Sequence, residues 1–212
     1  MVRPLKTINN QRKIKKMQKA KEYQTTIYRS DGTIYYISEF NPFTRKIVKV
    51  TNFQQDGTTV DSISDFDPST GKQVKQTKYR SDGTIKSIIE FDPSTGKQVK
   101  TINYQSDGTI YSIIELDPST GKPVKATIFQ QDGTTVESII EFDPFTGEEV
   151  KTTTYQSDGK TINFIEEFDP TTGEPVKTIN YRSDGTIKSI IEFDPSTGEI
   201  IKKHITTPTK NY

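Results

Sequence analysis

Short runs of alternating apolar and polar residues recur along most of the chain, separated by two kinds of polar turn. In the segment 81–105, the runs Ile85–Phe91 and Gln98–Tyr104 are seven residues long and rich in Ile, Val, Thr, Phe and Tyr. Segments of this length and composition, bounded by turn residues, are typical of β-strands. The linking sequences Asp-Pro-Ser-Thr-Gly and Ser-Asp-Gly are typical of tight turns. The pattern therefore predicts a two-stranded β-hairpin.

This hairpin unit is repeated seven times, once every 25 or 26 residues. Self-similarity at such a period is typical of tandem repeats. We therefore expect a β-repeat array over residues 23–212, preceded by a basic N-terminal arm over residues 1–22. The Asp-Gly turns contain Gly32, Gly57, Gly83, Gly108, Gly133, Gly159 and Gly185, and the partner turns begin at Asn41, Asp67, Asp92, Asp117, Asp143, Asp169 and Asp194.

The sequence of the partner turn predicts how its two strands pair. In Asp92–Gly96 the proline presets φ, the aspartate carboxylate can accept hydrogen bonds from turn amides, and the glycine can adopt a positive φ without penalty. We expect a type I turn closed by a glycine bulge. Such a turn pairs Phe91 with Gln98 and, if the strands alternate strictly, Ile89 with Lys100.

The Asp-Gly turn permits two registers. A two-residue loop would pair Gln105 with Ile110 and would turn every side chain of the next unit to the other face. A three-residue loop with a bulge at Gly108 pairs Tyr104 with Ile110, and we favour it because apolar rows then continue across the sheet. The 26-residue units support this choice, since a longer loop can absorb the extra residue that follows their glycine: Thr58, Thr134 and Lys160.

Under this register neither face of the sheet is distinctly apolar. One face carries a row in which aromatic and β-branched residues alternate, such as Tyr104 beside Ile110, together with the phenylalanine row that includes Phe91. Lysines such as Lys100 lie opposite isoleucines on that face, and glutamates such as Glu90 face valines on the other. A sandwich would make one face much more apolar than the other. We therefore expect an all-β fold, a long twisted antiparallel meander of tandem hairpins, single-layered or coiled. A sheet this long rarely stays open without curling, so a closed spiral is the alternative.

The two ends depart from the repeat. The turn Asn41–Arg45 lacks the glycine, so the sequence leaves its bulge open. Residues 1–24 carry eight Lys and Arg against one Glu, which gives them a charge of +7 and leaves −6 for the remaining chain. Such an arm can contact nucleic acid, anionic lipid or an acidic partner, whereas the acidic repeat body is a poor nucleic-acid surface. Residues 10–22 suit a short helix, which could cap the first strand or bind a ligand. The alternative is that this segment is a disordered arm.

The chain offers few residues for catalysis or for binding a cofactor. It has no cysteine and a single histidine, His204, which we interpret as a solvated surface residue. The carboxylate pair Glu90 and Asp92 recurs in most units, and this repetition favours turn formation and solubility over catalysis. Calcium-binding spacings are missing. We therefore expect no catalytic residue, no metal site, no cofactor and no enzyme activity. No run of about 18 apolar residues is present, so we expect no transmembrane segment, and no signal-peptide core occurs in the chain.

The repeat resembles a known family. The units SDGTIKSIIEFDPSTGKQVKTINYQSDG and SDGKTINFIEEFDPTTGEPVKTINYRSDG are similar to a phytoplasma tandem β-hairpin repeat of unknown function, and more distantly to bacterial YD/RHS repeats. The resemblance covers residues 23–203 and excludes the basic arm. It implies a secreted or surface-associated location at the boundary between bacterium and host, and it supplies no catalytic residues.

We interpret the chain as a non-catalytic repeat scaffold that binds a protein partner. A regular β-array presents a long surface, and one row of positions on it varies in chemistry between units. Two alternatives stay open, a structural surface protein or stalk that self-associates through its strand edges, and a carbohydrate-binding surface along the aromatic row. The expected partner-binding residues are Lys86, Tyr111, Glu137, Asn163 and Lys188.

Overall fold

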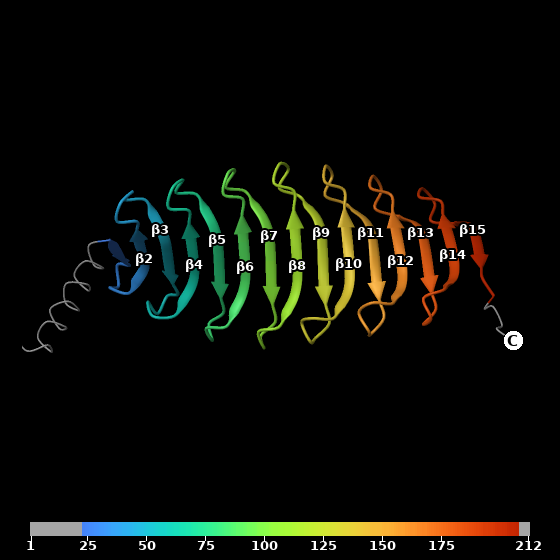
Figure 1. The fold of residues 1–212 in the computed structure, drawn as a ribbon, viewed down its shortest axis with the longest axis horizontal. Coiled ribbons are helices and arrows are strands. Elements are labelled where there is room, and N and C mark those ends of the chain that lie inside the picture. The colour runs from blue at the N-terminus through green and yellow to red at the C-terminus, as the bar shows by residue number, and fades with distance from the viewer. Residues whose placement is uncertain (1–22, 208–212) are drawn as a thin grey trace, which may run out of the picture. The chain divides into compact units, whose positions relative to one another are not determined.

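A computed structural model describes residues 23–207, and these residues form fifteen β-strands in one open sheet whose strands follow chain order. Every described pair of neighbouring strands is antiparallel, as Figure 1 shows. The expected all-β antiparallel meander is therefore confirmed, and its strands form an open sheet. The strands are β1 (Gln24–Tyr28), β2 (Ile34–Phe40), β3 (Ile47–Phe53), β4 (Val60–Phe66), β5 (Gln73–Tyr79), β6 (Ile85–Phe91), β7 (Gln98–Tyr104), β8 (Ile110–Leu116), β9 (Pro123–Phe129), β10 (Val136–Phe142), β11 (Glu149–Tyr155), β12 (Ile162–Phe168), β13 (Pro175–Tyr181), β14 (Ile187–Phe193) and β15 (Ile200–Ile205).

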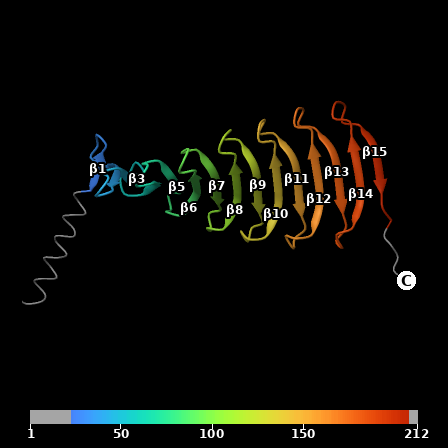
Figure 2. The same cartoon turned by 45° about the horizontal axis from the view of Figure 1, so that its top comes forward.

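The described residues divide into two compact units. The first comprises residues 23–85 with 93–96, and the second comprises residues 86–92 with 97–207. Each unit is a run of consecutive hairpins, which can be followed by colour in Figure 2. The helix expected within residues 10–22 and the basic arm over residues 1–22 lie outside the described residues.

The Asp-Pro turns are built as the sequence predicts. In Asp67–Gly71 the carboxylate Oδ1 accepts hydrogen bonds from the amides of Ser69, at 2.9 Å, and Thr70, at 2.7 Å. The amide of Gly71 donates to the carbonyl of Asp67 at 2.8 Å, and Gly71 has a φ of 78°. The glycine therefore provides the left-handed residue that closes the turn.

The turn Asn41–Arg45 keeps this geometry without a glycine. Arg45 has a φ of 60°, and its amide donates to the carbonyl of Asn41 at 2.9 Å. Asn41 Oδ1 accepts the amides of Phe43 and Thr44, each at 2.9 Å. The bulge that the sequence left open is present, because Phe40 pairs with Ile47 while Glu39 pairs with Lys49. The asparagine side chain thus builds the turn well enough for an arginine to occupy the left-handed position.

The pairing between strands corrects one expectation. Phe91 pairs with Gln98 and Tyr104 pairs with Ile110, as predicted, but a bulge follows each of these pairs. Lys100 consequently lies opposite Glu90 rather than Ile89. The strict alternation we assumed was wrong because each hairpin connection carries one extra residue in a strand, and one extra residue exchanges the faces beyond it.

The bulges also redistribute the two faces. Between bulges, directly paired residues share a face and successive residues alternate. Lys100, Ile102 and Tyr104 therefore lie on one face, while Phe91 lies on the other face beside Ile89. The aromatic–isoleucine row and the phenylalanine row were expected to share a face, and the register places them on opposite faces. We call the surface that bears Lys100 and its paired residues the ladder face, and the opposite surface the neutral face.

Neither unit has a conventional core. Among residues 23–207 Ala126 is the buried hydrophobic residue, with 6% of its surface exposed, and no large side chain is fully buried. The buried polar residues are small ones on the strands, such as Ser112, which is 3% exposed. Asn103 Nδ2 donates to Ser112 Oγ at 3.0 Å across the strands, so this buried hydroxyl is satisfied. Most isoleucines are half-buried by lateral contact alone, as expected for a single layer.

Candidate binding surface

The five residues expected to contact a partner occupy the second position of five even-numbered strands. Tyr111 is 52% exposed, and Lys86, Glu137, Asn163 and Lys188 are also exposed. We call these five residues the contact row. The structure does not bring them into one cluster, because each lies on a different strand: β6, β8, β10, β12 and β14.

The register explains why four of these side chains are exposed. Tyr104 pairs with Ile110 while Asn103 pairs with Ser112, which leaves Tyr111 as the extra residue of a bulge. The corresponding register shifts leave Glu137, Asn163 and Lys188 as the extra residues of their bulges. Bulges redirect a side chain and interrupt the ladder of backbone hydrogen bonds. Four of the five contact-row residues are therefore bulge residues, which the sequence pattern alone did not show.

The same position in the first unit holds two further exposed residues that sequence reasoning missed. Tyr35 is passed over between the pairs Tyr28–Ile34 and Ile27–Tyr36, and it is 50% exposed. Asp61 is the corresponding residue of β4 and is also exposed. The signal that could have found them is their place in the repeat, because both directly follow the first strand residue after an Asp-Gly turn.

The turn carboxylates are occupied by their own turns. Asp132 Oδ1 accepts the amides of Thr134, at 2.9 Å, and Thr135, at 2.8 Å, and Oδ2 accepts the Thr135 hydroxyl at 2.5 Å. The Thr135 hydroxyl, followed by the two amides, lowers the pKa of Asp132 to about 2. No group of three or more His, Cys, Asp or Glu residues among 23–207 is arranged to hold a metal ion. His204 lies exposed on β15 opposite Ile190. These carboxylates have a structural role in the turns.

Alternating charges cross the ladder face in each unit. In the second unit Lys100 pairs with Glu90 and Glu115, and the alternation continues through every strand to Lys202 on β15. The first unit shows the same order from Glu39 to Lys75. The complete series in the second unit is Glu90, Lys100, Glu115, Lys125, Glu141, Lys151, Glu167, Lys177, Glu192 and Lys202.

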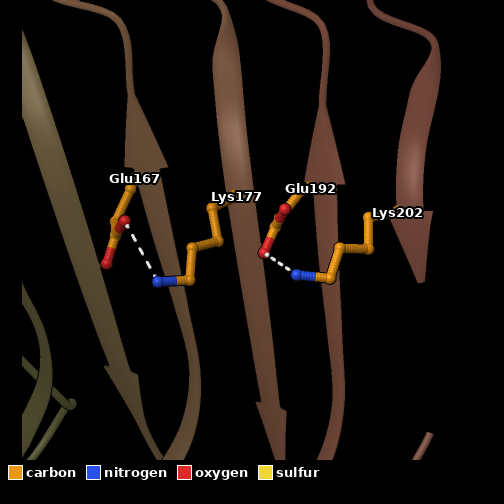
Figure 3. Close-up of polar contacts among 4 residues, drawn as sticks. All are labelled: Glu167, Lys177, Glu192 and Lys202. Carbon is orange, nitrogen blue, oxygen red and sulfur yellow. Dashed lines mark hydrogen bonds and ion pairs between the residues drawn. The ribbon is translucent and has the colours of Figure 1, made fainter. Parts of the chain in front are cut away.

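Several neighbours in this ladder form ion pairs. Lys151 Nζ lies 2.9 Å from Glu141 Oε2, and this hydrogen bond raises the pKa of Lys151. Figure 3 shows the pairs Lys177–Glu167, at 3.6 Å, and Lys202–Glu192, at 3.3 Å. These side chains are partly exposed, so each pair contributes only about 0.2–1 kcal/mol. Because the charges of the ladder neutralise one another, the ladder favours the observed strand register and is a poor site for binding an ion.

Lysines also connect consecutive Asp-Pro turns. Lys97 Nζ donates to the carbonyl of Ser119 at 2.6 Å, and Lys122 Nζ donates to the carbonyl of Thr146 at 3.1 Å. The equivalent positions in the last three units hold Glu148, Glu174 and Glu199. A carboxylate cannot donate to a carbonyl, so these turns lack this connection.

Two turn tips expose a phenylalanine, and two shallow hollows lie in the first unit. Phe43 is 92% exposed and Phe145 is 78% exposed, and the sequence reasoning did not single out either residue. One hollow of about 450 Å³ is lined by Tyr79 and Ile63 together with Asp82, and the other, of about 370 Å³, includes Tyr23. The aromatic row from Phe53 through Tyr79 to Tyr181 is otherwise half-buried between neighbouring strands.

The comparison with protein families agrees with the repeat period. A family described as "Protein of unknown function (DUF2963)" matches residues 28–78, 79–128, 129–178 and 155–205. Successive matches thus span about two hairpin units each. A comparison with curated proteins finds no match. No helix within residues 23–207 is long and apolar enough to cross a membrane.

Solved structures give weaker similarities. A mutant of S. aureus TarM in complex with Fondaparinux, alpha-GlcNAc-glycerol and UDP is 15% identical, with a TM-score of 0.37, over 56% of this chain and 22% of that one. The TcdB2-TccC3 structure is 12% identical, with a TM-score of 0.28, over 89% of this chain and 13% of that one. A porin-like protein from Bacteroides uniformis is 12% identical, with a TM-score of 0.25, over 85% and 86% of the two chains. The chain thus spans about a fifth or less of the first two proteins.

Proposed function

We propose that this chain, which belongs to the DUF2963 family of proteins of unknown function, is a non-catalytic scaffold that binds a protein partner through its contact row. The observation that carries the proposal is the contrast between constant turns and this variable row. The Asp-Gly turn is rebuilt in every unit, whereas the exposed bulge residue that follows it changes from basic to aromatic, acidic and amide.

A row of this kind suits recognition of another protein. Tyrosine supplies a large contact area at low entropic cost, and charged residues around it supply specificity and orientation. Bulges present these side chains without disturbing the strands between them. Because the repeat resembles that of phytoplasma surface-associated proteins, the partner we propose is a protein at the boundary between bacterium and host.

The proposal of a scaffold without catalysis is supported by what the carboxylates do. Asp82, Asp107 and the other turn aspartates are held by threonine hydroxyls and turn amides. The ladder glutamates face lysines in neighbouring strands. Neither arrangement leaves an acid and a base convergent on a cleft, which hydrolytic chemistry requires.

The experiment compares two five-fold alanine variants of the full chain. One variant replaces the contact row, and the control replaces five exposed turn residues, one from each of the corresponding units: Ser81, Ser106, Gln131, Ser157 and Ser183. The wild-type protein and each variant are immobilised, and proteins that bind them are captured from host and bacterial lysates. The affinity of each captured protein for the wild-type chain and for both variants is then measured directly. We expect the contact-row variant to lose at least tenfold in affinity and the control to lose less than twofold. Equal affinity for both variants would refute the role of the contact row.

The hollow beside Tyr79 favours a second candidate, carbohydrate binding. Its lining joins an aromatic ring to the polar residues Ser81 and Asp82. An aromatic platform with nearby polar groups suits a sugar ring. Glycan-array binding that is lost in Tyr79→Ala, and kept in the contact-row variant, would replace the protein-binding proposal with this one.

A further inference from the structure

The neutral face of the second unit is a large sheet surface with few charges. Between the bulges of β6–β15, the register places Glu166 of β12 and Lys203 of β15 on this face, and Glu149 lies at its margin. The corresponding row in the other even strands consists of isoleucines, among them Ile89, Ile114 and Ile140. Phe91, Leu116 and Phe142 form a second apolar row beside it.

We propose that this face is the contact surface between two copies of the chain, which pack face to face through their neutral faces. A β-sheet with an apolar face buries that face against another layer in stable domains. In the second unit the isoleucines of the neutral face are only half-buried, and Ala126 is the buried hydrophobic residue among residues 23–207. A second sheet would complete the burial.

The distribution of charge selects the neutral face over the ladder face. Packing two ladder faces together would take about ten charges per copy out of water, and their mutual attraction seldom compensates for that loss of hydration. The neutral face avoids this cost over most of its area. A second copy also meets the requirement of a two-fold interface, in which one patch must fit itself, because a patch with so few charges brings few like charges together.

The size of the face is sufficient for a stable dimer. Ten strands about 4.8 Å apart, each with about five central residues rising roughly 3.4 Å apiece, give a footprint of approximately 750 Å². Standard interfaces bury about 800 Å² on each partner. Glu166 lies within this footprint, so it weakens the dimer and gives the proposal a directional test.

Two adjacent isoleucines of β8 provide the matched pair. Ile114 lies on the neutral face opposite Thr101 and Ala126, whereas Ile113 lies on the ladder face opposite Ile102 and Thr127. Both are half-buried, so Ile114→Glu and Ile113→Glu impose similar changes on the sheet itself. In sedimentation equilibrium of the full chain we expect a concentration-dependent dimer. We expect Ile114→Glu to raise the dissociation constant of the dimer at least tenfold, and Ile113→Glu to leave it within threefold of the wild-type value.

A gain-of-function pair guards against a variant that fails to fold. Glu166→Ile restores the residue of the other units on the neutral face and tightens the dimer at least tenfold. Thr127→Ile makes the corresponding apolar change on the ladder face, where Ile113 and Ile139 occupy its row, and leaves the dissociation constant unchanged. Circular dichroism confirms that each variant keeps its strand content.

Three results would overturn the proposal. They are a monomer at every soluble concentration, equal effects of the two glutamate substitutions, or a dimer lost only when the edge strand β15 is disrupted by His204→Pro, a change on the ladder face. The third result would show edge pairing in place of face packing. Because none of these substitutions touches the contact row, the outcome is independent of the proposed partner binding.

Discussion

The turns lie along two opposite sides of the sheet, at the ends of its strands, and we call these sides the Asp-Pro edge and the Asp-Gly edge. The two sides accommodate variation differently. On the Asp-Pro edge every turn has the same length, and a Cβ built on Gly121 meets nothing within 4 Å. On the Asp-Gly edge three turns carry an extra residue, and those turns press on the preceding one. A Cβ on Gly133 would lie 2.7 Å from Thr109 Cβ and 2.8 Å from the Ile110 amide nitrogen. The Asp-Pro edge therefore varies in side chains, whereas the Asp-Gly edge varies in loop length and packing.

The largest expected effect separates the long from the short Asp-Gly turns. Gly108→Ala places alanine at a φ of 89° in open space, which costs about 1 kcal/mol. Gly133→Ala adds a clash with backbone, which raises the loss by roughly a further 1–3 kcal/mol. Thermal unfolding followed by circular dichroism should rank wild type above Gly108→Ala and Gly108→Ala above Gly133→Ala. Equal losses would show that the long turns do not press on their neighbours.

The next effect tests the one Asp-Pro-type turn without a glycine. Arg45→Gly removes the cost of a left-handed arginine and should stabilise the protein by up to about 1 kcal/mol. The gain is reduced by the loss of the arginine stacked over Tyr23, 4.8 Å from the ring centre. Gly121→Arg is the reverse change at the equivalent position and should destabilise. An Arg45→Gly variant less stable than wild type would show that the stacking outweighs the backbone strain.

Acidification tests the contribution of one turn carboxylate, Asp132 of an Asp-Gly turn. The folded state holds the pKa of Asp132 at about 2, below its ordinary value of 3.8, so the ionised carboxylate stabilises the fold above about pH 4. This contribution is lost as the pH falls toward 2. Asp132→Asn should therefore lower stability at neutral pH and flatten the acid limb of the stability profile between pH 4 and pH 2. An unchanged acid limb would contradict the assignment of the low pKa to this turn.

The smallest effect concerns the lysines that connect Asp-Pro turns. Lys122→Glu removes the hydrogen bond to Thr146 and should cost about 0.2–1 kcal/mol. Glu148→Lys introduces a donor where the last three turns have none and should give a gain of similar size. Added salt should reduce both values only in part, because the carbonyl acceptor is uncharged, whereas the attraction between Lys122 and the Asp143 carboxylate is screened. A strong salt dependence would indicate general charge effects in place of this contact.

The strands and turns followed from the sequence because their signals are local. The seven-residue runs, the positive-φ glycines and the Asp92–Gly96 type of turn each depend on residues close in the chain. The pair Tyr104–Ile110 was also predicted correctly, as was the longer loop that absorbs Thr134.

The faces did not follow, because a bulge one residue long has no local composition signal in this chain. Lys100 was placed opposite an isoleucine, and an ion-pair ladder was missed although its lysines and glutamates recur at the repeat period. A search for opposite charges at matching repeat positions could have found it. The exposure of Tyr111 was inferred from its variability, and its origin in a bulge required the register.

The register with two bulges in each full repeat underlies the ladder, both faces and the contact row, and a cross-linking measurement tests it directly. The chain has no cysteine, so Ile102→Cys with Ile113→Cys creates a single pair on directly opposed residues of β7 and β8. Paired strand residues lie within the span of a disulfide. The account predicts that this pair oxidises readily to an intramolecular disulfide, while Ile102→Cys with Ser112→Cys, the pair favoured by strict alternation, does not. The reverse result would contradict the bulged register.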